Sequence, residues 1–305
     1  MSTETKSLPV VTAAASPCCA PSTSSDRCCD PLSSVAVAEP APAALEESSD
    51  VRAMVREKYG AVANGEPCGC GCCAGPAEAE AVLEKLGYTA EQAAAIPEGA
   101  NLGLGCGNPI AHAALRPGET VLDLGSGAGI DCFLAAREVG PSGRAIGVDM
   151  THAMLERARA TAKKIGATNV EFRLGEIEHL PVADASVDAI ISNCVVNLSP
   201  DKAQVFREAL RVLAPGGRLV VSDLVLTREL SPEMRRHAEL YAGCVAGASL
   251  EADYLRLIGE AGFTGVTVLE RTGYDVGAAS YPEGSPERDA FSAVVSIKVR
   301  ATRKP

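Results

Sequence analysis

The chain has 305 residues, of which 47% are hydrophobic and 22% are charged, a balance typical of a globular protein with a sizeable core. Its formal net charge of −11 argues against a nucleic-acid or anionic-membrane partner, because phosphate contacts require clusters of Lys and Arg that this chain does not collect. It lacks the run of about 18 apolar residues that a membrane span needs, and Glu4 and Pro9 make its N-terminus a poor secretory signal, so we expect a soluble, cytoplasmic protein.

Residues 1–47 are rich in Ser, Pro, Ala and Thr and carry almost no large apolar side chains. Such a segment buries too little surface to offset the entropy of ordering it, so we expect a disordered tail. Eight of the twelve cysteines precede residue 75, and four of these lie in the tail. Clustered thiols in a reducing compartment indicate soft-metal or redox chemistry rather than a disulfide framework.

Residues 48–116 are expected to form a helical N-terminal cap with a Cys-rich loop. The stretch SSDVRAMVREKYGAVA places apolar side chains on one helical face, and Pro109 suits the first turn of a later helix. The loop CGCGCCAG, residues 68–75, has no apolar periodicity, so something other than a core must hold it. The helices of the cap are predicted over residues 48–60, 76–86 and 90–95 and after Pro109.

Residues 117–226 alternate between strand and helix patterns, and we expect them to form the core of the fold. Apolar runs rich in β-branched residues predict buried parallel strands at residues 119–125, 144–150, 170–176, 187–193 and 216–224. Helices are predicted between them at residues 129–139, 151–166 and 201–213. Strands separated by helices of this length imply right-handed crossovers and a doubly wound α/β sheet.

Residues 227–305 are expected to complete the sheet and the substrate site. A helical stretch over residues 231–262 is interrupted by the loop AGCVAGAS. Two strand-like runs follow it, at residues 265–271 and 291–300.

The turn between the first predicted strand and its helix is rich in glycine, which allows the backbone to turn sharply and to approach a nucleotide-type cofactor. The turn consists of Gly125, Ser126, Gly127, Ala128 and Gly129. Asp149 ends the second strand about twenty residues further on, where a carboxylate can accept both ribose hydroxyls. Ile130 stands where a dinucleotide fingerprint has its last glycine, and Asp123 suits a sulfonium cation, so we predict S-adenosylmethionine as the cofactor.

Four other residues at the predicted carboxyl edge of the sheet are assigned to the same cofactor. Glu176 and Ile177 follow the third strand, where they can bracket an adenine ring, and Met150 offers an apolar face to it. Simple packing at the rim is the alternative for these residues. Asn193, the last residue of the fourth strand, completes the predicted cofactor set.

Cys194 follows the fourth predicted strand, and ligands of open α/β sheets bind in the crevice outside such strand ends. For a single cysteine, the alternative is a small buried apolar residue. Cys106 and Cys244 are flanked by glycine and are expected on loops with open access, whereas Cys132 lies within a predicted helix and is expected to be structural. Three loop thiols around one crevice would form a soft trigonal pocket.

Four motifs together resemble the arsenite methyltransferases, which are S-adenosylmethionine-dependent enzymes with the class I methyltransferase fold. The motifs are ISNCVVNLSPDK, DLGSGAGIDCFLAA, GVDMT and YAGCVAGA. The similarity runs from about Val51 to Phe263. It implies a seven-stranded, doubly wound Rossmann-like α/β sheet and a trivalent arsenic bound by Cys106, Cys194 and Cys244.

The resemblance also implies arsenite and methylated arsenicals as substrates. The arsenic lone pair would attack the methyl carbon of S-adenosylmethionine while the thiolates orient it, so that no general base is needed. Arsenic would be left oxidised and then reduced by protein thiols, and thioredoxin or glutathione would reopen the resulting disulfide. Candidates for this relay are Cys68, Cys70, Cys72 and Cys73. The chain departs from eukaryotic members of the family at Gly103 and Leu104, where those members carry an aromatic pair before the Gly-Cys-Gly that contains Cys106.

Two other functions are compatible with parts of the pattern. A methyltransferase that acts on carbon or oxygen of a quinone or sterol would use the cofactor site without thiols, so it would stay active after Cys194→Ser replacement. A thiol-rich protein that binds a metalloid or zinc would bind arsenite but not S-adenosylmethionine. CGCGCC lacks the paired CxxC spacing of a structural zinc site, and the cysteine pairs of the tail either capture a metal or belong to a spacer.

Overall fold

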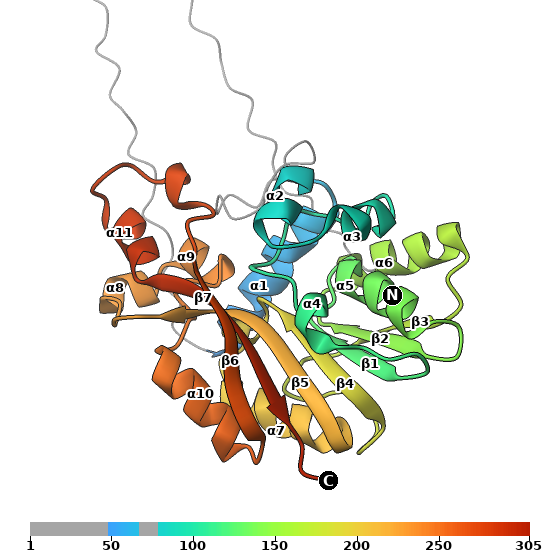
Figure 1. Ribbon diagram of the computed structural model, residues 1–305. Coiled ribbons are helices and arrows are strands. Elements are labelled where there is room, and N and C mark those ends of the chain that lie inside the picture. The colour runs from blue at the N-terminus through green and yellow to red at the C-terminus, as the bar shows by residue number, and fades with distance from the viewer. Residues whose placement is uncertain (1–47, 67–78) are drawn as a thin grey trace, which may run out of the picture. The chain divides into compact units, whose positions relative to one another are not determined.

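Seven strands form one mixed sheet with the order β3-β2-β1-β4-β5-β7-β6 (Figure 1), in a computed structural model that describes residues 48–66 and 79–305. The strands are β1 (Thr120–Leu124), β2 (Arg144–Asp149), β3 (Val170–Leu174), β4 (Val187–Asn193), β5 (Leu213–Leu226), β6 (Thr264–Gly273) and β7 (Val294–Thr302). Strands β1 to β5 are parallel, whereas β7 is antiparallel to both of its neighbours. The sheet confirms the predicted doubly wound α/β fold.

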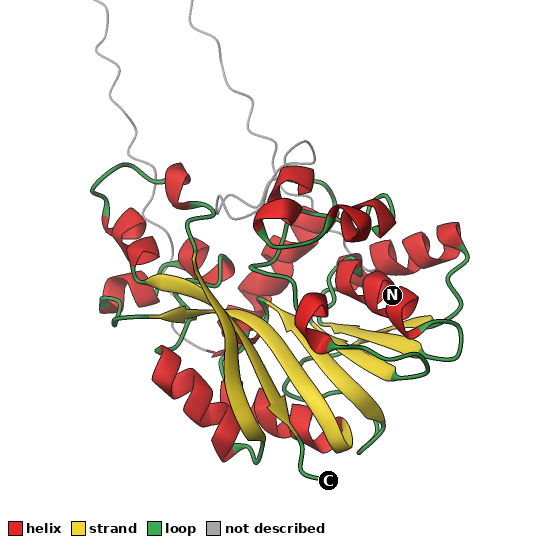
Figure 2. Ribbon diagram, viewed as in Figure 1, coloured by secondary structure: helices red, strands yellow, loops and turns green. Residues whose placement is uncertain are grey.

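Helices cover both faces of the sheet (Figure 2). They are α1 (Ser48–Ala63), α2 (Ala79–Lys85), α3 (Ala90–Ala95), α4 (Ile110–Ala113), α5 (Ile130–Val139), α6 (His152–Ile165), α7 (Lys202–Val212), α8 (Pro232–Arg235), α9 (Ala238–Ala242), α10 (Glu251–Glu260) and α11 (Pro286–Ser292), with short 3-10 turns η1 (Val196–Leu198) and η2 (Ala278–Ser280). Side chains of successive strand residues point to opposite faces. Accordingly, Val121 packs in the core shared with α5 and α6, and Leu122 packs in the core shared with α7 and α10.

A third apolar cluster lies beyond the carboxyl ends of β4 and β5. It joins α1, through Val51 and Val55, to α9 and to the end of β5 at Leu224. Helix α1 is also tied down by polar contacts, because the Tyr59 hydroxyl donates to the carbonyl of Ala242 at 3.1 Å. The N-terminal and C-terminal segments therefore meet over the edge of the sheet where a ligand would bind.

The structure corrects three details of the sequence prediction. β5 begins at Leu213 instead of residue 216, because Leu213 pairs with Val187 ahead of a register shift in β4. The run predicted as a strand from residue 291 begins inside α11, whose N-cap Ser285 accepts a hydrogen bond from the Arg288 amide. The turn η1, which follows Val195, was not predicted, because Val196 and Leu198 resemble a continuation of the apolar strand.

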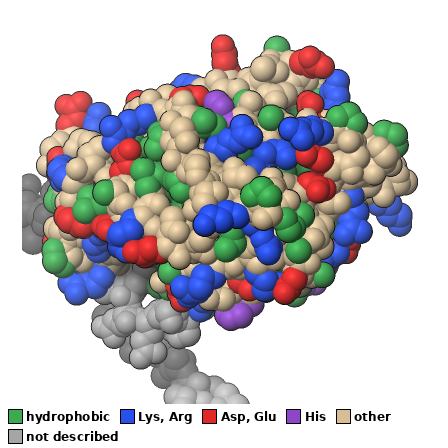
Figure 3. Space-filling model, turned by 60° about the horizontal axis from the view of Figure 1, so that its bottom comes forward, with side chains coloured by type: hydrophobic (Ala, Val, Ile, Leu, Met, Phe, Trp, Pro, Cys, Tyr) green, Lys and Arg blue, Asp and Glu red, His purple; other side chains and the backbone are tan. Residues whose placement is uncertain are grey.

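The lower face of Figure 1, on the side of α7, α10 and the C-terminus, carries Lys and Arg side chains interspersed with Asp and Glu (Figure 3). On α10, for example, Arg256 bonds Glu260 at 2.9 Å. In residues 48–66 and 79–305, no helix is both long enough and apolar enough to cross a membrane. The described residues belong to one compact unit, and the division into cap, core and C-terminal region stays a prediction. The predicted tail and the Cys-rich loop lie outside the described residues.

Candidate active site

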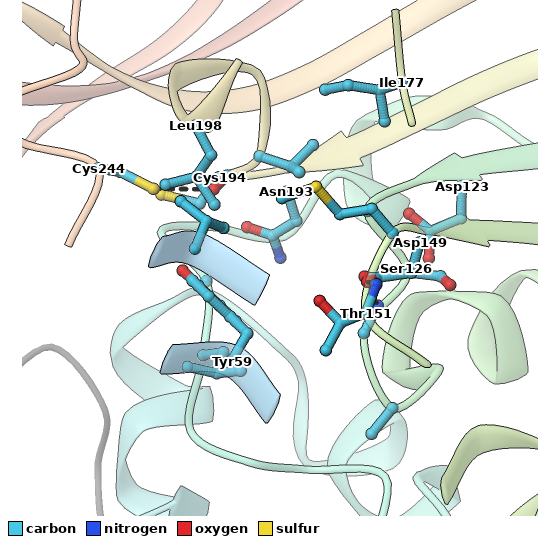
Figure 4. A pocket seen from close by; sticks show the side chains of 18 of the residues that line it. Tyr59, Asp123, Ser126, Asp149, Thr151, Ile177, Asn193, Cys194, Leu198 and Cys244 are labelled. Carbon is cyan, nitrogen blue, oxygen red and sulfur yellow. Dashed lines mark hydrogen bonds between the residues drawn. The ribbon is translucent and has the colours of Figure 1, made fainter. Parts of the chain in front are cut away.

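One cavity at the carboxyl edge of the sheet is lined by both groups of predicted site residues (Figure 4). It encloses about 1200 Å³ of empty space, part of which opens to solvent. The turn after β1, the end of β2 at Asp149 and the end of β4 at Cys194 form its floor, while Tyr59 of α1 and Cys244 approach from the N-terminal and C-terminal segments. The topology thus brings the glycine turn and two of the three candidate thiols into one space.

The glycine turn is held by Asp149. The amide of Gly127 donates to Asp149 Oδ2 at 2.9 Å, and the amide of Thr151 donates to Asp149 Oδ1 at 2.7 Å. Gly125 has φ +66°, and a Cβ at this position would lie 2.3 Å from Cγ2 of Val195. No other residue fits there without displacing the segment that follows Cys194.

Three carboxyl groups line the same part of the cavity: Asp123, Asp131 and Asp149. Burial raises the pKa of each of them, and for Asp131 the pKa rises to about 6. The nearby carboxyl of Asp131 raises the pKa of Asp123 further. Ser126 Oγ is buried and makes no hydrogen bond within residues 48–66 and 79–305. A cationic ligand with hydroxyl groups fits this set of acceptors, whereas a pyrophosphate would be repelled.

The rim of the cavity matches the prediction in part. Ile177 and Met150 line it as expected. Glu176 is not among the lining residues, and its carboxylate lies 3.3 Å from the guanidinium of Arg56. Glu178 faces the cavity in its place and accepts hydrogen bonds from Ser199 Oγ at 2.7 Å and from Arg52 at 2.9 Å. The roles of these rim residues in cofactor binding stay predictions.

The backbones of Cys194 and Cys244 are both left-handed, with φ angles of +59° and +64°. This conformation is rare for residues with a Cβ and persists where the surrounding structure enforces it. The amide of Cys194 donates to the carbonyl of Ser222 on β5 at 2.8 Å, and the Cys244 thiol donates to the carbonyl of Cys194 at 2.9 Å. These contacts turn both thiols out of their chain segments and toward each other (Figure 4).

Cys106 reaches the same place from the N-terminal segment. Its sulfur, that of Cys194 and a carboxylate oxygen of Asp223 lie within 4.8 Å of one another. Burial raises the pKa of Cys106, and hydrogen bonding to Cys106 and then to Cys244 raises the pKa of Cys194 well above its usual range. These two thiols are therefore protonated at neutral pH in the absence of a ligand.

The prediction of open access for Cys106 and Cys244 was wrong, because their exposed fractions are only 3% and 2%. The glycines beside Cys106 allow close packing rather than exposure. A Cβ on Gly107 would lie 2.0 Å from Ser222 Oγ. Cys132 is fully buried, and its thiol donates to Asp123 at 3.5 Å.

Asp223 was not predicted from the sequence, because it lies inside the apolar run of β5, with Leu224, Val225 and Leu226 after it. It is fully buried behind the thiols, and burial raises its pKa to about 7. Its oxygens accept hydrogen bonds from Tyr254, Asn197 and the amide of Leu224, each at 2.9 Å. With these acceptors already engaged, Asp223 supports the thiol cluster from behind rather than offering a free ligand.

The raised pKa of Asp223 predicts a pH dependence of stability. An Asp in the unfolded chain titrates at about pH 4, so the stability contributed by the protonated carboxyl is complete below that pH and is lost as pH rises through about 7. Between about pH 4.5 and pH 8, the wild-type protein should lose a few kcal/mol of unfolding free energy relative to Asp223→Asn. Urea unfolding of both proteins across this range measures the difference, and parallel curves would refute the assignment.

The left-handed backbone at Cys194 predicts which of two variants at this position is more stable. Cys194→Gly and Cys194→Ala both remove the thiol, but only alanine keeps a Cβ in the disfavoured conformation. The glycine variant should therefore be more stable by about 1 kcal/mol. Urea unfolding compares the two variants, and an alanine variant of equal or higher stability would show that the backbone at this position is unstrained.

Residues 115–262 match the family model described as a methyltransferase domain. Together with the seven-stranded sheet and the cavity at its carboxyl edge, this match places the protein among the class I methyltransferases.

Similar proteins identify the family to which the chain belongs within the class I methyltransferases. The chain is 48% identical over 271 residues to an arsenite methyltransferase of Halobacterium salinarum, a stretch that covers 85% of this chain and 68% of that protein. It is 47% identical over 173 residues to an arsenite methyltransferase of Aquipseudomonas alcaligenes, covering 54% of this chain and 49% of that protein. The chain belongs to the arsenite methyltransferase family, which confirms the resemblance seen in the sequence motifs.

A solved structure agrees with this assignment. The crystal structure of an arsenic (III) S-adenosylmethionine methyltransferase from Chlamydomonas reinhardtii is similar to this chain at a TM-score of 0.59 and 38% sequence identity. The similarity covers 76% of this chain and 75% of that one.

Proposed function

We propose that this protein transfers methyl groups from S-adenosylmethionine to trivalent arsenic bound by Cys106, Cys194 and Cys244. One observation carries the proposal: a glycine turn lined with carboxyl groups opens into the same cavity as Cys194 and Cys244, and the sulfur of Cys106 lies beside that of Cys194. Transfer to a quinone or sterol is not favoured, because such an acceptor would make no use of three convergent thiols.

The residues around the glycine turn fit S-adenosylmethionine, which supplies an electrophilic methyl group on a sulfonium. Asp149 would accept hydrogen bonds from the ribose hydroxyls, with its two oxygens already oriented by the amides of Gly127 and Thr151. Ile177 and Met150 would bracket the adenine. The buried carboxyls of Asp123 and Asp131 favour a positively charged ligand, because a cation offsets the cost of burying their negative charge.

The three thiols would hold arsenic by exchange. Arsenite releases one water molecule for each thiol it binds, so that each thiol proton leaves as part of that water and each As–O bond is replaced by an As–S bond. Because Cys106 and Cys194 are protonated beforehand, the exchange buries no additional net charge. Three sulfur ligands leave arsenic one lone pair, and catalysis then rests on directing this lone pair toward the donor side of the cavity.

Apolar walls would protect the As–S bonds from water. Val55, Leu198 and Tyr274 line the cavity near the thiols, and the Tyr59 ring approaches them from α1 (Figure 4). A dry site also prevents hydroxide from competing with thiolate for the arsenic.

A reductant completes the proposed cycle. Each transfer raises the formal oxidation state of arsenic by two, and two thiols return it to the trivalent state by forming a disulfide. Thioredoxin or glutathione would reduce this disulfide. The relay candidates Cys68, Cys70, Cys72 and Cys73 lie outside the described residues, so their role stays a proposal.

The test is incubation of the purified protein with arsenite, glutathione and S-adenosylmethionine, followed by chromatographic speciation of the arsenic. We expect methylated arsenicals and an equivalent amount of S-adenosylhomocysteine. Omitting the protein or the methyl donor should leave arsenite unchanged. Absence of methylated products from a protein that binds S-adenosylmethionine by calorimetry would refute the proposed function.

A further inference from the structure

The Asn193 side chain connects the Cys106 loop to the cofactor side of the cavity. Its Oδ1 accepts a hydrogen bond from the Cys106 amide at 3.0 Å, and its Nδ2 donates to the Gly107 carbonyl at 2.8 Å. The same Nδ2 lies 3.1 Å from Asp131 Oδ2 and 3.1 Å from the Tyr88 hydroxyl, which itself donates to Asp131 Oδ1 at 2.8 Å. The Asn193 side-chain amide therefore bonds both the amide of Cys106 and the carbonyl of Gly107, which flank the Cys106 side chain.

These hydrogen bonds hold the Cys106 loop, which contains no helix or strand. The residues around Cys106 lie in a loop between α3 and α4, so their position depends on contacts made from elsewhere in the chain. Gly105 has φ +113°, and a Cβ there would come within 3.0 Å of the Asn193 amide. On the opposite side, Ser296 Oγ donates to the Cys106 carbonyl at 2.8 Å. The loop is therefore fitted against Asn193 at close range.

Asn193 also immediately precedes Cys194. A residue that fixes the Cys106 backbone while covalently joined to Cys194 sets the separation of the two sulfurs. Asn193 lines the cavity, and it was predicted from the sequence to belong to the cofactor set. We propose instead that Asn193 is a positioning residue that places Cys106 as the third arsenic ligand. The inference rests on the proposed function and identifies the residue that makes the thiol site three-coordinate.

Arsenite and methylarsenite can bind different numbers of thiols, so comparing the two substrates distinguishes a role in placing Cys106 from a general effect on the fold. Arsenite exchanges three hydroxyl groups and can use three thiols, whereas methylarsenite keeps its As–C bond and exchanges only two. Cys194 and Cys244 line the cavity and touch each other, while Cys106 is not among the lining residues. Two-coordinate methylarsenite is therefore held by Cys194 and Cys244 and does not depend on the placement of Cys106.

The test compares Asn193→Ala with the wild-type protein on both substrates. We expect kcat/KM for arsenite to fall about tenfold or more, since loss of the paired hydrogen bonds frees the Cys106 loop. We expect kcat/KM for methylarsenite and the KM for S-adenosylmethionine to change less than about threefold. The double variant Asn193→Ala with Cys106→Ser should be no worse on arsenite than Cys106→Ser alone, because both changes remove the same ligand.

The matched control is Asn169→Ala. Asn169 is equally half-buried and donates to two backbone carbonyls, those of Ala136 and Gly140, at 2.9 and 3.0 Å. It lies outside the cavity lining, so its loss should not distinguish arsenite from methylarsenite. Equal losses on both substrates in Asn193→Ala, or a selective rise in the KM for S-adenosylmethionine, would overturn the inference.

A measurement without turnover separates this inference from the proposed function. In the ligand-free protein, iodoacetamide labelling of Cys106, followed by mass spectrometry, should be about tenfold faster in Asn193→Ala than in the wild type, while labelling of Cys194 stays within about threefold. Asn193→Asp changes only one atom, replacing the donor to Gly107 by an acceptor, and should show the same selective increase. Unchanged labelling of Cys106 in both variants would overturn the positioning role even if the wild type methylates arsenite.

Discussion

Replacing Cys194 with serine is expected to abolish methyl transfer to arsenite and to methylarsenite alike. Cys194 is central to the cluster, because its thiol contacts those of both Cys106 and Cys244. Serine keeps the size and the backbone contacts but offers a hard oxygen where a soft thiolate is required. We expect kcat/KM to fall by about 10³ or more for both substrates, measured by chromatographic speciation of products.

The affinity for S-adenosylmethionine should survive this change, since the glycine turn is untouched. Cys132→Ser is the matched control, because Cys132 is a buried thiol outside the cluster, and it should retain transfer. A Cys194→Ser protein that still methylates an acceptor at the wild-type rate would contradict the arsenic mechanism and would favour an organic substrate.

Replacing Asp149 with asparagine is expected to weaken S-adenosylmethionine binding by about tenfold to a hundredfold. The change removes a charged acceptor that holds the Gly127 amide, and it sets an NH₂ group against that amide. It also removes the group proposed to accept the ribose hydroxyls. Isothermal titration calorimetry measures the affinity for the cofactor directly.

Arsenite binding is the internal control for Asp149→Asn, because Asp149 is not part of the thiol cluster. Asp188→Asn is the external control, because Asp188 also accepts a backbone amide, that of Thr120 at 2.8 Å, but lies outside the cavity lining. Wild-type cofactor affinity in Asp149→Asn would show that this carboxylate does not contact the cofactor.

The features predicted correctly from the sequence are those that depend on neighbouring residues in the chain. Apolar runs and glycine turns predicted the strands and placed Asp149 at the end of β2, because strand ends and turns depend on neighbouring residues. The loop positions of Cys106, Cys194 and Cys244 suggested a shared thiol pocket, but their role as three arsenic ligands was predicted only through the resemblance to a family. No periodicity connects these thiols, because Cys194 follows Cys106 by 88 residues and Cys244 follows Cys194 by 50.

The features that were missed depend on long-range packing. Tyr88, Asp131 and Asn193 form one hydrogen-bonded group although up to 105 residues separate them. Asp131 lies in the first turn of α5, two residues after Gly129, and this position was the one available sign of its role. Glu178 faces the cavity in place of Glu176 because the loop after β3 turns between them, and sequence spacing does not fix such a turn.

The prediction of open access for Cys106 and Cys244 was wrong because burial, too, depends on long-range packing. From the sequence, a glycine beside a cysteine predicts an open loop. In the structure the glycines beside Cys106 remove the side chains that would otherwise keep neighbouring backbone away, so the loop packs against Asn193 and Ser222. Glycine indicates close approach as readily as exposure.

Arsenic K-edge X-ray absorption of the arsenite complex tests the central geometry most directly. The sample should contain one arsenite per protein and no added thiol, with the eight cysteines that precede residue 75 changed to serine. Convergence of Cys106, Cys194 and Cys244 predicts three sulfur neighbours around arsenic and no oxygen neighbour, and Cys106→Ser should reduce this to two sulfurs and one oxygen. An oxygen neighbour, or fewer than three sulfurs, in the protein that retains Cys106, Cys194 and Cys244 would contradict it.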